Sequence, residues 1–124
     1  MDAISTATIV VIDDDEVVRD SLKALLEIRN FSVVEYSSGR DFLNRQDDVT
    51  PGCLILDIHM PDMTGLDLLK QLRLRGDNVP AILITGRRET STQAQADSLG
   101  AVALLDKPIS HPALFAAISS ALHR

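Results

Sequence analysis

Apolar residues gather in five short runs, separated by segments in which apolar residues follow a helical spacing. The runs are rich in Ile, Val and Leu and mostly do not alternate with polar residues, which is typical of strands buried on both faces of a parallel sheet. The five predicted strands are Ile9–Ile12, Phe31–Tyr36, Cys53–Leu56, Ala81–Ile84 and Ala101–Leu105.

The intervening segments predict helices. Val18, Leu22 and Leu25 define the first helix, and Asn30 is a plausible stop in the left-handed region. The others are predicted from Ser37 or Ser38 through Leu43, after Thr64 over 66–72, over Glu89–Leu99, and from Pro112 to Leu122. Strict alternation of strands and helices predicts an α/β fold, a doubly wound five-stranded parallel sheet of order 2-1-3-4-5 with helices on both faces.

The last helix carries no formally charged side chain between His111 and Leu122. We expect Phe115, Ile118 and Leu122 to face the core. Leu114, Ala117 and Ala121 are then expected to point outward. Together with the preceding helix and the last strand, they would form a contact surface for a homodimer or another partner.

Composition narrows the function classes. A length of 124 residues predicts one domain over 1–124, and a net charge of −6 argues against direct nucleic-acid binding. The single cysteine, Cys53, lies in an apolar run and is expected to be a buried hydrophobic residue. With no signal peptide and no apolar stretch of membrane-spanning length visible, we expect a cytoplasmic protein.

Polar residues follow the predicted strands where that sheet order brings strand ends together. Asp13 and Asp14 follow strand 1, Asp57 follows strand 3, Thr85 follows strand 4, and Lys107 comes after strand 5. In a doubly wound sheet, ligands bind beyond the carboxyl ends of the strands at the switch point between strands 1 and 3. We therefore expect all five residues to converge on one crevice.

Three close carboxylates repel one another unless a positive group lies among them. Mg²⁺ prefers oxygen ligands and retains several waters, so few carboxylates suffice to hold it. Lys107 adds a second positive charge and Thr85 a hydroxyl donor. An aspartate in such a crevice can act as a nucleophile on phosphorus, which indicates a site for phosphoryl chemistry.

These residues, with Met60-Pro61, Gly65 and Lys107-Pro108, resemble the receiver domain of bacterial two-component response regulators over essentially the whole chain. Ile84-Thr85-Gly86 and Gly100-Ala101-Val102 resemble the FixJ-like branch of this CheY-like superfamily. The resemblance implies a signalling phosphoacceptor that is not a turnover enzyme. Its expected partner is a sensor histidine kinase or a phosphotransfer protein, and it would switch a protein–protein interaction or relay the phosphoryl group.

The resemblance also implies a role for each site residue. Asp57 would accept the phosphoryl group, and Asp14, Asp57 and the backbone carbonyl of His59 would bind Mg²⁺. Asp13 would act through metal-bound water. Thr85 and Lys107 would contact the phosphoryl group, and the Lys107–Pro108 peptide bond would be cis.

Neighbouring residues leave alternatives open. The His59 side chain would influence phosphoryl lifetime, touch the metal, or lie at the rim without a role. Arg87 and Arg88 would steer a phosphorylated partner or be ordinary loop residues. Leu104 stands where the family usually has an aromatic switch residue, so either backbone movement near Thr85 carries the signal or the switch is muted.

Two other functions compete with that of an active receiver. A degenerate receiver would have lost an acceptor or a metal ligand, and none is lost here. A hydrolase of the haloacid-dehalogenase type would need an aspartate at position 59, which is His59. We further expect a stand-alone receiver if the chain is complete, and a DNA-binding output domain elsewhere if it is part of a longer protein.

Overall fold

The computed structural model describes residues 7–123. Its strands are β1 Thr8–Ile12, β2 Ser32–Tyr36, β3 Cys53–Asp57, β4 Ala81–Thr85 and β5 Ala103–Asp106. Its helices are α1 Glu16–Ile28, α2 Gly39–Leu43, α3 Gly65–Leu74, α4 Thr92–Ser98 and α5 His111–Leu122. All strands pair in parallel in the order β2-β1-β3-β4-β5, which confirms the predicted fold class and sheet order.

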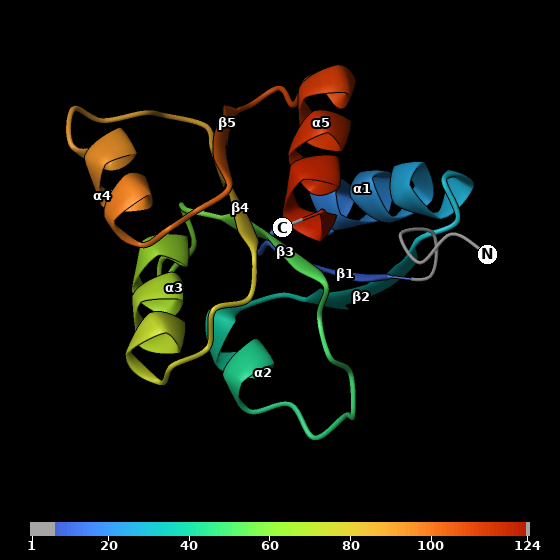
Figure 1. The fold of residues 1–124 in the computed structure, drawn as a ribbon, viewed down its shortest axis with the longest axis horizontal. Coiled ribbons are helices and arrows are strands. Elements are labelled where there is room, and N and C mark those ends of the chain that lie inside the picture. Colours follow the sequence, from blue (N-terminus) through green and yellow to red (C-terminus); the bar gives the residue numbers. More distant parts are fainter. Residues whose placement is uncertain (1–6, 124) are drawn as a thin grey trace.

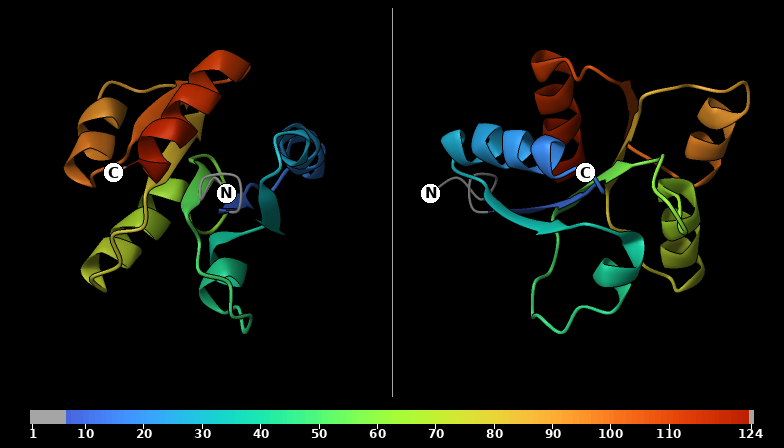
Figure 2. Two further views of the ribbon diagram at one scale, coloured as in Figure 1. Left: turned by 45° about the vertical axis from the view of Figure 1, so that its right-hand side comes forward. Right: turned by 180° about the vertical axis from the view of Figure 1, so that it is seen from behind.

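Helices cover both faces of the sheet (Figures 1 and 2), and an apolar layer lies beneath them on each face. Alternate residues of β1 point in opposite directions, so Ile9 and Val11 join the layer of α1 and α5. Val10 and Ile12 join the opposite layer, where Phe42 of α2, Leu68 of α3 and Ala96 of α4 also lie. The central strands β3 and β4 are buried throughout, as their unbroken apolar sequences predict.

Short-range signals in the sequence set the helix ends. Asp15 caps α1, with its carboxylate accepting from the Val17 amide, and Ser38 caps α2 by accepting from the Asp41 amide. Thr64 and Asp67 form a reciprocal capping box at the start of α3. The chain after α1 turns at Asn30, whose φ is 69°, as predicted.

Two elements begin two or more residues later than predicted. Helix α4 begins at Thr92 rather than near Glu89, because the Thr92 hydroxyl accepts from the Glu89 amide at 3.0 Å and holds the preceding turn. Strand β5 begins at Ala103 rather than Ala101, after a turn in which the Gly100 φ is 69°.

The predicted orientation of α5 was wrong. Leu114, Ala117 and Ala121, expected on the outer surface, are buried against the sheet together with Ile118. Both the predicted and the observed stripes have helical spacing and share Ile118, so periodicity does not separate them. The observed stripe places two alanines on the sheet, and Phe115 and Leu122 flank it half-buried.

Burial explains the state of Cys53. Cys53 is a free cysteine in the core, as predicted, and burial raises the pKa of its thiol to about 12. Within residues 7–123, no helix combines the length and apolar character needed to cross a membrane. The first six residues, which bear on the expectation about a signal peptide, lie outside the described part of the chain.

Candidate phosphoacceptor site

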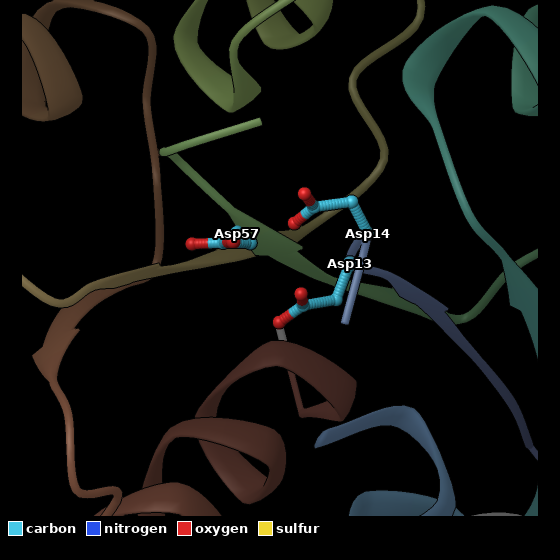
Figure 3. Close-up of side chains that lie close together, drawn as sticks. All are labelled: Asp13, Asp14 and Asp57. Atoms are coloured by element: carbon cyan, nitrogen blue, oxygen red, sulfur yellow. The ribbon is translucent and has the colours of Figure 1, made fainter. Parts of the chain in front are cut away.

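Three carboxylates gather at the carboxyl ends of β1 and β3, which are neighbouring strands in the sheet (Figure 3). One oxygen from each of Asp13, Asp14 and Asp57 lies within 4.8 Å of the others. Asp13 and Asp57 are each only 3% exposed, whereas Asp14 is exposed to solvent. The strand ends therefore bring together the three aspartates that the sequence analysis selected.

The backbone holds Asp13 from three directions. Its amide donates to the Tyr36 carbonyl of β2 at 3.2 Å, and its own carbonyl accepts from Arg19 Nη1 of α1 at 2.6 Å. Its carboxylate Oδ1 accepts from the Asp15 amide at 2.9 Å. This last contact fixes Oδ1, while Oδ2 faces Lys107.

Lys107 is the cation of the cluster. Its Nζ lies 3.6 Å from Asp13 Oδ2 and 3.6 Å from Asp57 Oδ2. Its backbone amide donates to the Thr85 carbonyl at 2.9 Å, which ties the loop after β5 to the end of β4. The Lys107–Pro108 peptide bond is cis, as expected.

The electrostatics of the cluster are unbalanced. Burial is the largest cause of the raised pKa of both Asp13 and Asp57. Repulsion from Asp57 raises the pKa of Asp13 further, and Asp14 does the same for Asp57. Lys107 opposes both pKa shifts, but its single positive charge cannot neutralise three ionised carboxylates.

Gly65 lets α3 start directly against the end of β3, where Asp57 lies. A Cβ at this position would lie 2.4 Å from the Asp57 carbonyl oxygen, closer than any side chain tolerates. The Gly65 amide donates to the Ile58 carbonyl at 3.0 Å, and the Ile58 amide donates to the Ile84 carbonyl at 2.9 Å. The glycine in the motif is therefore explained by contact with the backbone of Asp57 itself.

Thr85 lies at the end of β4, fully buried, with its hydroxyl turned to the following loop. The hydroxyl donates to the Arg87 carbonyl at 2.8 Å and accepts from the Arg87 amide at 3.1 Å. His59 Nε2 lies 2.9 Å from the same oxygen and 3.0 Å from the Arg87 carbonyl. Asp13, Asp14, Asp57 and Lys107 thus come together as predicted, while the Thr85 hydroxyl bonds to groups outside the carboxylate cluster.

Sequence reasoning missed the role of Arg88. Its guanidinium forms an ion pair with Asp106 at 3.2 Å and donates to the Leu104 carbonyl at 3.1 Å and to Gln93 Oε1 at 2.8 Å. Arg88 therefore joins the loop after β4 to β5 and α4, rather than pointing free into solvent. The Leu104 side chain is buried in the layer that includes Leu83 and Ala96.

Comparison with known proteins shows which family has this sequence and fold. The response regulator receiver domain family model matches residues 9–119. The chain belongs to the response regulator receiver domain family. Phosphorylation on aspartate is general for this family of two-component signalling proteins.

Relatives of this receiver domain include the transcriptional regulatory protein FixJ of Azorhizobium caulinodans, which is 39% identical over 92% of this chain and 54% of its own length. The response regulator protein TodT of Pseudomonas putida is 38% identical over 94% of the chain and 51% of its own length. The crystal structure of FixJ-N superposes with a TM-score of 0.85 at 36% identity, covering 95% of this chain and 94% of that one. These likenesses confirm the predicted FixJ-like character, and this receiver domain spans about half the length of those curated relatives.

Proposed function

We propose that Asp57 of this receiver domain accepts a phosphoryl group from the phosphohistidine of a sensor kinase or a phosphotransfer protein. A carboxylate oxygen of Asp57 would form the new bond to phosphorus as the phosphorus–nitrogen bond breaks, and the histidine nitrogen would keep the bonding electron pair. The observation that carries the proposal is the buried Asp57 carboxylate beside Lys107 and two further carboxylates.

The carboxylate cluster fits a hard divalent cation. Asp13, Asp14 and Asp57 offer oxygen ligands within 4.8 Å of one another, and Lys107 leaves their charge incompletely balanced. Asp14, Asp57 and the His59 carbonyl would hold Mg²⁺, and Asp13 would act on its water ligands. The ion supplies positive charge beside the phosphoryl oxygens, which lowers the barrier to transfer.

The other site residues would complete the transfer. Lys107 would contact the phosphoryl oxygens through the same Nζ that now faces Asp13 and Asp57. Thr85 would turn its hydroxyl toward the phosphoryl group. The same residues would support slow hydrolysis of the aspartyl phosphate, so the domain catalyses reactions only on itself and is not a turnover enzyme.

The output would be a changed interaction or a relayed phosphoryl group. FixJ is named a transcriptional regulatory protein, and such regulators suggest a DNA-binding partner domain for this receiver. The proposed homodimer surface needs a different set of contacts from the one first predicted. Leu114, Ala117 and Ala121 are buried, so the exposed side chains of α4, β5 and α5 would have to provide it.

The test is intact mass after incubation with acetyl phosphate and Mg²⁺. We expect one added phosphoryl group on the wild-type chain and none on Asp57→Asn, whose side chain is isosteric but far less nucleophilic. Asp62→Asn is a matched control, because Asp62 is an exposed residue of the same loop whose φ of 69° asparagine also tolerates. Phosphate retained on Asp57→Asn, or none on wild type with any phosphodonor, would contradict the proposal.

A further inference from the structure

The His59 side chain makes a contact that joins two loops of the site. It leaves the loop after β3, two residues beyond Asp57, and its Nε2 reaches Thr85 Oγ1 at 2.9 Å and the Arg87 carbonyl at 3.0 Å. We call the His59 imidazole, the Thr85 hydroxyl and the Arg87 carbonyl the Thr85 latch. The latch spans 26 residues of sequence between His59 and Thr85.

The partners of the latch define where its protons lie. A carbonyl oxygen only accepts, so the 3.0 Å contact with the Arg87 carbonyl requires a proton on His59 Nε2. The Thr85 hydroxyl gives its own proton to the Arg87 carbonyl and accepts from His59 Nε2 and the Arg87 amide. Its one proton and both lone pairs are thus in use, and none remains for a phosphoryl oxygen.

We propose that His59 is a positioning residue that holds the Thr85 hydroxyl away from Asp57 while Asp57 carries no phosphoryl group. The latch must open before Thr85 can donate to a phosphoryl oxygen. Any contact made only in the unphosphorylated arrangement opposes the phosphorylated one by the free energy of that contact. The inference rests on the proposed function and concerns this equilibrium.

His59 differs from the rest of the latch in one useful respect. The bonds between Thr85 and Arg87 join residues two apart, and a hydroxyl in a turn commonly makes such local bonds unaided. Within the latch, His59 is the member that ties this turn to the loop that follows Asp57. Because its side chain is exposed, its replacement leaves no core cavity, and measured changes report on the lost hydrogen bonds.

The experiment measures the affinity for beryllofluoride, which mimics a phosphoryl group on aspartate, in the presence of Mg²⁺. The variants are His59→Ala, which removes the donor, and His59→Gln, whose amide nitrogen supplies a donor at similar reach. Each is made in the wild-type background and in Thr85→Val. One net hydrogen bond corresponds to about a two- to tenfold change in an equilibrium constant.

We expect His59→Ala to bind beryllofluoride about two- to tenfold more tightly than wild type. His59→Gln should restore most of the wild-type affinity, and the effect of His59→Ala should lose most of its size in the Thr85→Val background. Equal or weaker binding by His59→Ala would overturn the proposal. An equal gain in both backgrounds would also overturn it, because His59 would then act without Thr85.

A second measurement needs no phosphoryl chemistry and so separates the latch from the proposed function. Long-range ¹H–¹⁵N spectra of the metal-free protein, at a pH where the ring is neutral, should show His59 with its proton on Nε2. The Nε2 signal should shift in Thr85→Val. A neutral ring protonated on Nδ1 instead would overturn the latch, whereas failure of wild type to bind beryllofluoride with an intact latch spectrum would count against the proposed function.

Discussion

Two regions of this receiver domain carry charged side chains but differ in how deeply these side chains are buried. At the carboxylate cluster, the carboxyl ends of β1 and β3 hold Asp13 and Asp57 almost completely buried, with raised pKa values. On the outer face formed by α4, β5 and α5, the charged pair Arg88 and Asp106 is partly open to solvent, with side chains 36% and 64% exposed. Burying a charge lowers the stability of the fold, whereas an exposed charge has almost no effect on it. The carboxylate cluster therefore destabilises the fold in a way that the ion pair on the outer face does not.

The regions also differ in what fixes their side chains. At the site, each functional residue ends a strand or follows one, so the sheet order alone decides which residues meet. On the outer face, the residues that are left exposed depend on how α5 packs, and several stripes of one helix have acceptable spacing. The following predictions test this contrast, from the largest expected effect to the smallest.

Leu114→Ala tests the packing of α5. Leu114 is fully buried against the sheet, so its truncation should lower the free energy of unfolding by about 2–5 kcal/mol. The measurement is urea unfolding. Ser120→Ala, on the exposed side of the same helix, should change stability by less than about 0.5 kcal/mol. Equal small effects for both variants would restore the outward orientation expected from the sequence.

Gly65→Ala tests the close approach of α3 to the backbone of Asp57 at the end of β3. The added Cβ would meet the Asp57 carbonyl oxygen at 2.4 Å, so the backbone must shift at a cost of about 1–3 kcal/mol or more. Phosphorylation of Asp57 should slow as well, because its backbone moves. Gly86→Ala is the control, since its Cβ would find its nearest neighbour, Lys107 Cδ, at 3.8 Å. Thermal unfolding and acetyl phosphate kinetics report both effects, and equal behaviour of the two variants would refute the steric argument.

Asp57→Asn tests how much the buried carboxylate lowers the stability of the fold. Burial raises the pKa of Asp57, so between its ordinary pKa and the raised value the folded chain keeps a proton that the unfolded chain has released. Stability of the metal-free protein therefore falls as pH rises through that window. Asparagine does not ionise, so Asp57→Asn does not lose stability in this way. We expect the variant to be more stable than wild type at pH 7 by on the order of 1 kcal/mol. Near pH 3, where both states of wild type are protonated, the gain should vanish.

Adding Mg²⁺ should reverse this comparison. A cation bound only by the folded state stabilises it, so wild type should gain more from Mg²⁺ than Asp57→Asn does. Asp20→Asn, at an exposed position of α1, should follow wild type at every pH. Unfolding curves at several pH values, with and without Mg²⁺, provide the measurement. A variant less stable than wild type at pH 7 without Mg²⁺ would show that the Lys107 attraction outweighs burial.

The sequence predicted the fold and all three aspartates of the carboxylate cluster for physical reasons. Unbroken apolar runs specify buried parallel strands. The site residues directly follow these runs, so the order of the strands is enough to predict that the residues lie close together. The same logic does not reach contacts made by side chains across loops. His59 bonding to Thr85, and Arg88 bonding to Leu104 and Asp106, depend on loop conformation, which no periodicity encodes.

The α5 error has a related cause. Phe115 and Leu122 are larger than the alanines at 117 and 121, so a size-weighted pattern favours them as core residues. In the fold, the two alanines share the buried stripe of α5 with Leu114 and Ile118, and Phe115 and Leu122 flank that stripe half-buried. Three-dimensional fit therefore decided between two stripes that the spacing left equivalent.

Arg88→Met gives the smallest expected effect and examines the outer face directly. Methionine keeps much of the side-chain length but removes the ion pair with Asp106 and the donors to Leu104 and Gln93. Because both charged partners are exposed, the free energy of unfolding should fall by no more than about 1 kcal/mol, and phosphorylation of Asp57 should persist. Amide resonances of Leu104, Leu105 and Asp106 should nevertheless respond less to beryllofluoride than in wild type, since the side-chain contacts of Arg88 with Leu104 and Asp106 are gone while the backbone pairing of β4 with β5 remains. An undiminished response would mean that the signal reaches β5 without Arg88, and would leave the buried Leu104 side chain as the next residue to substitute.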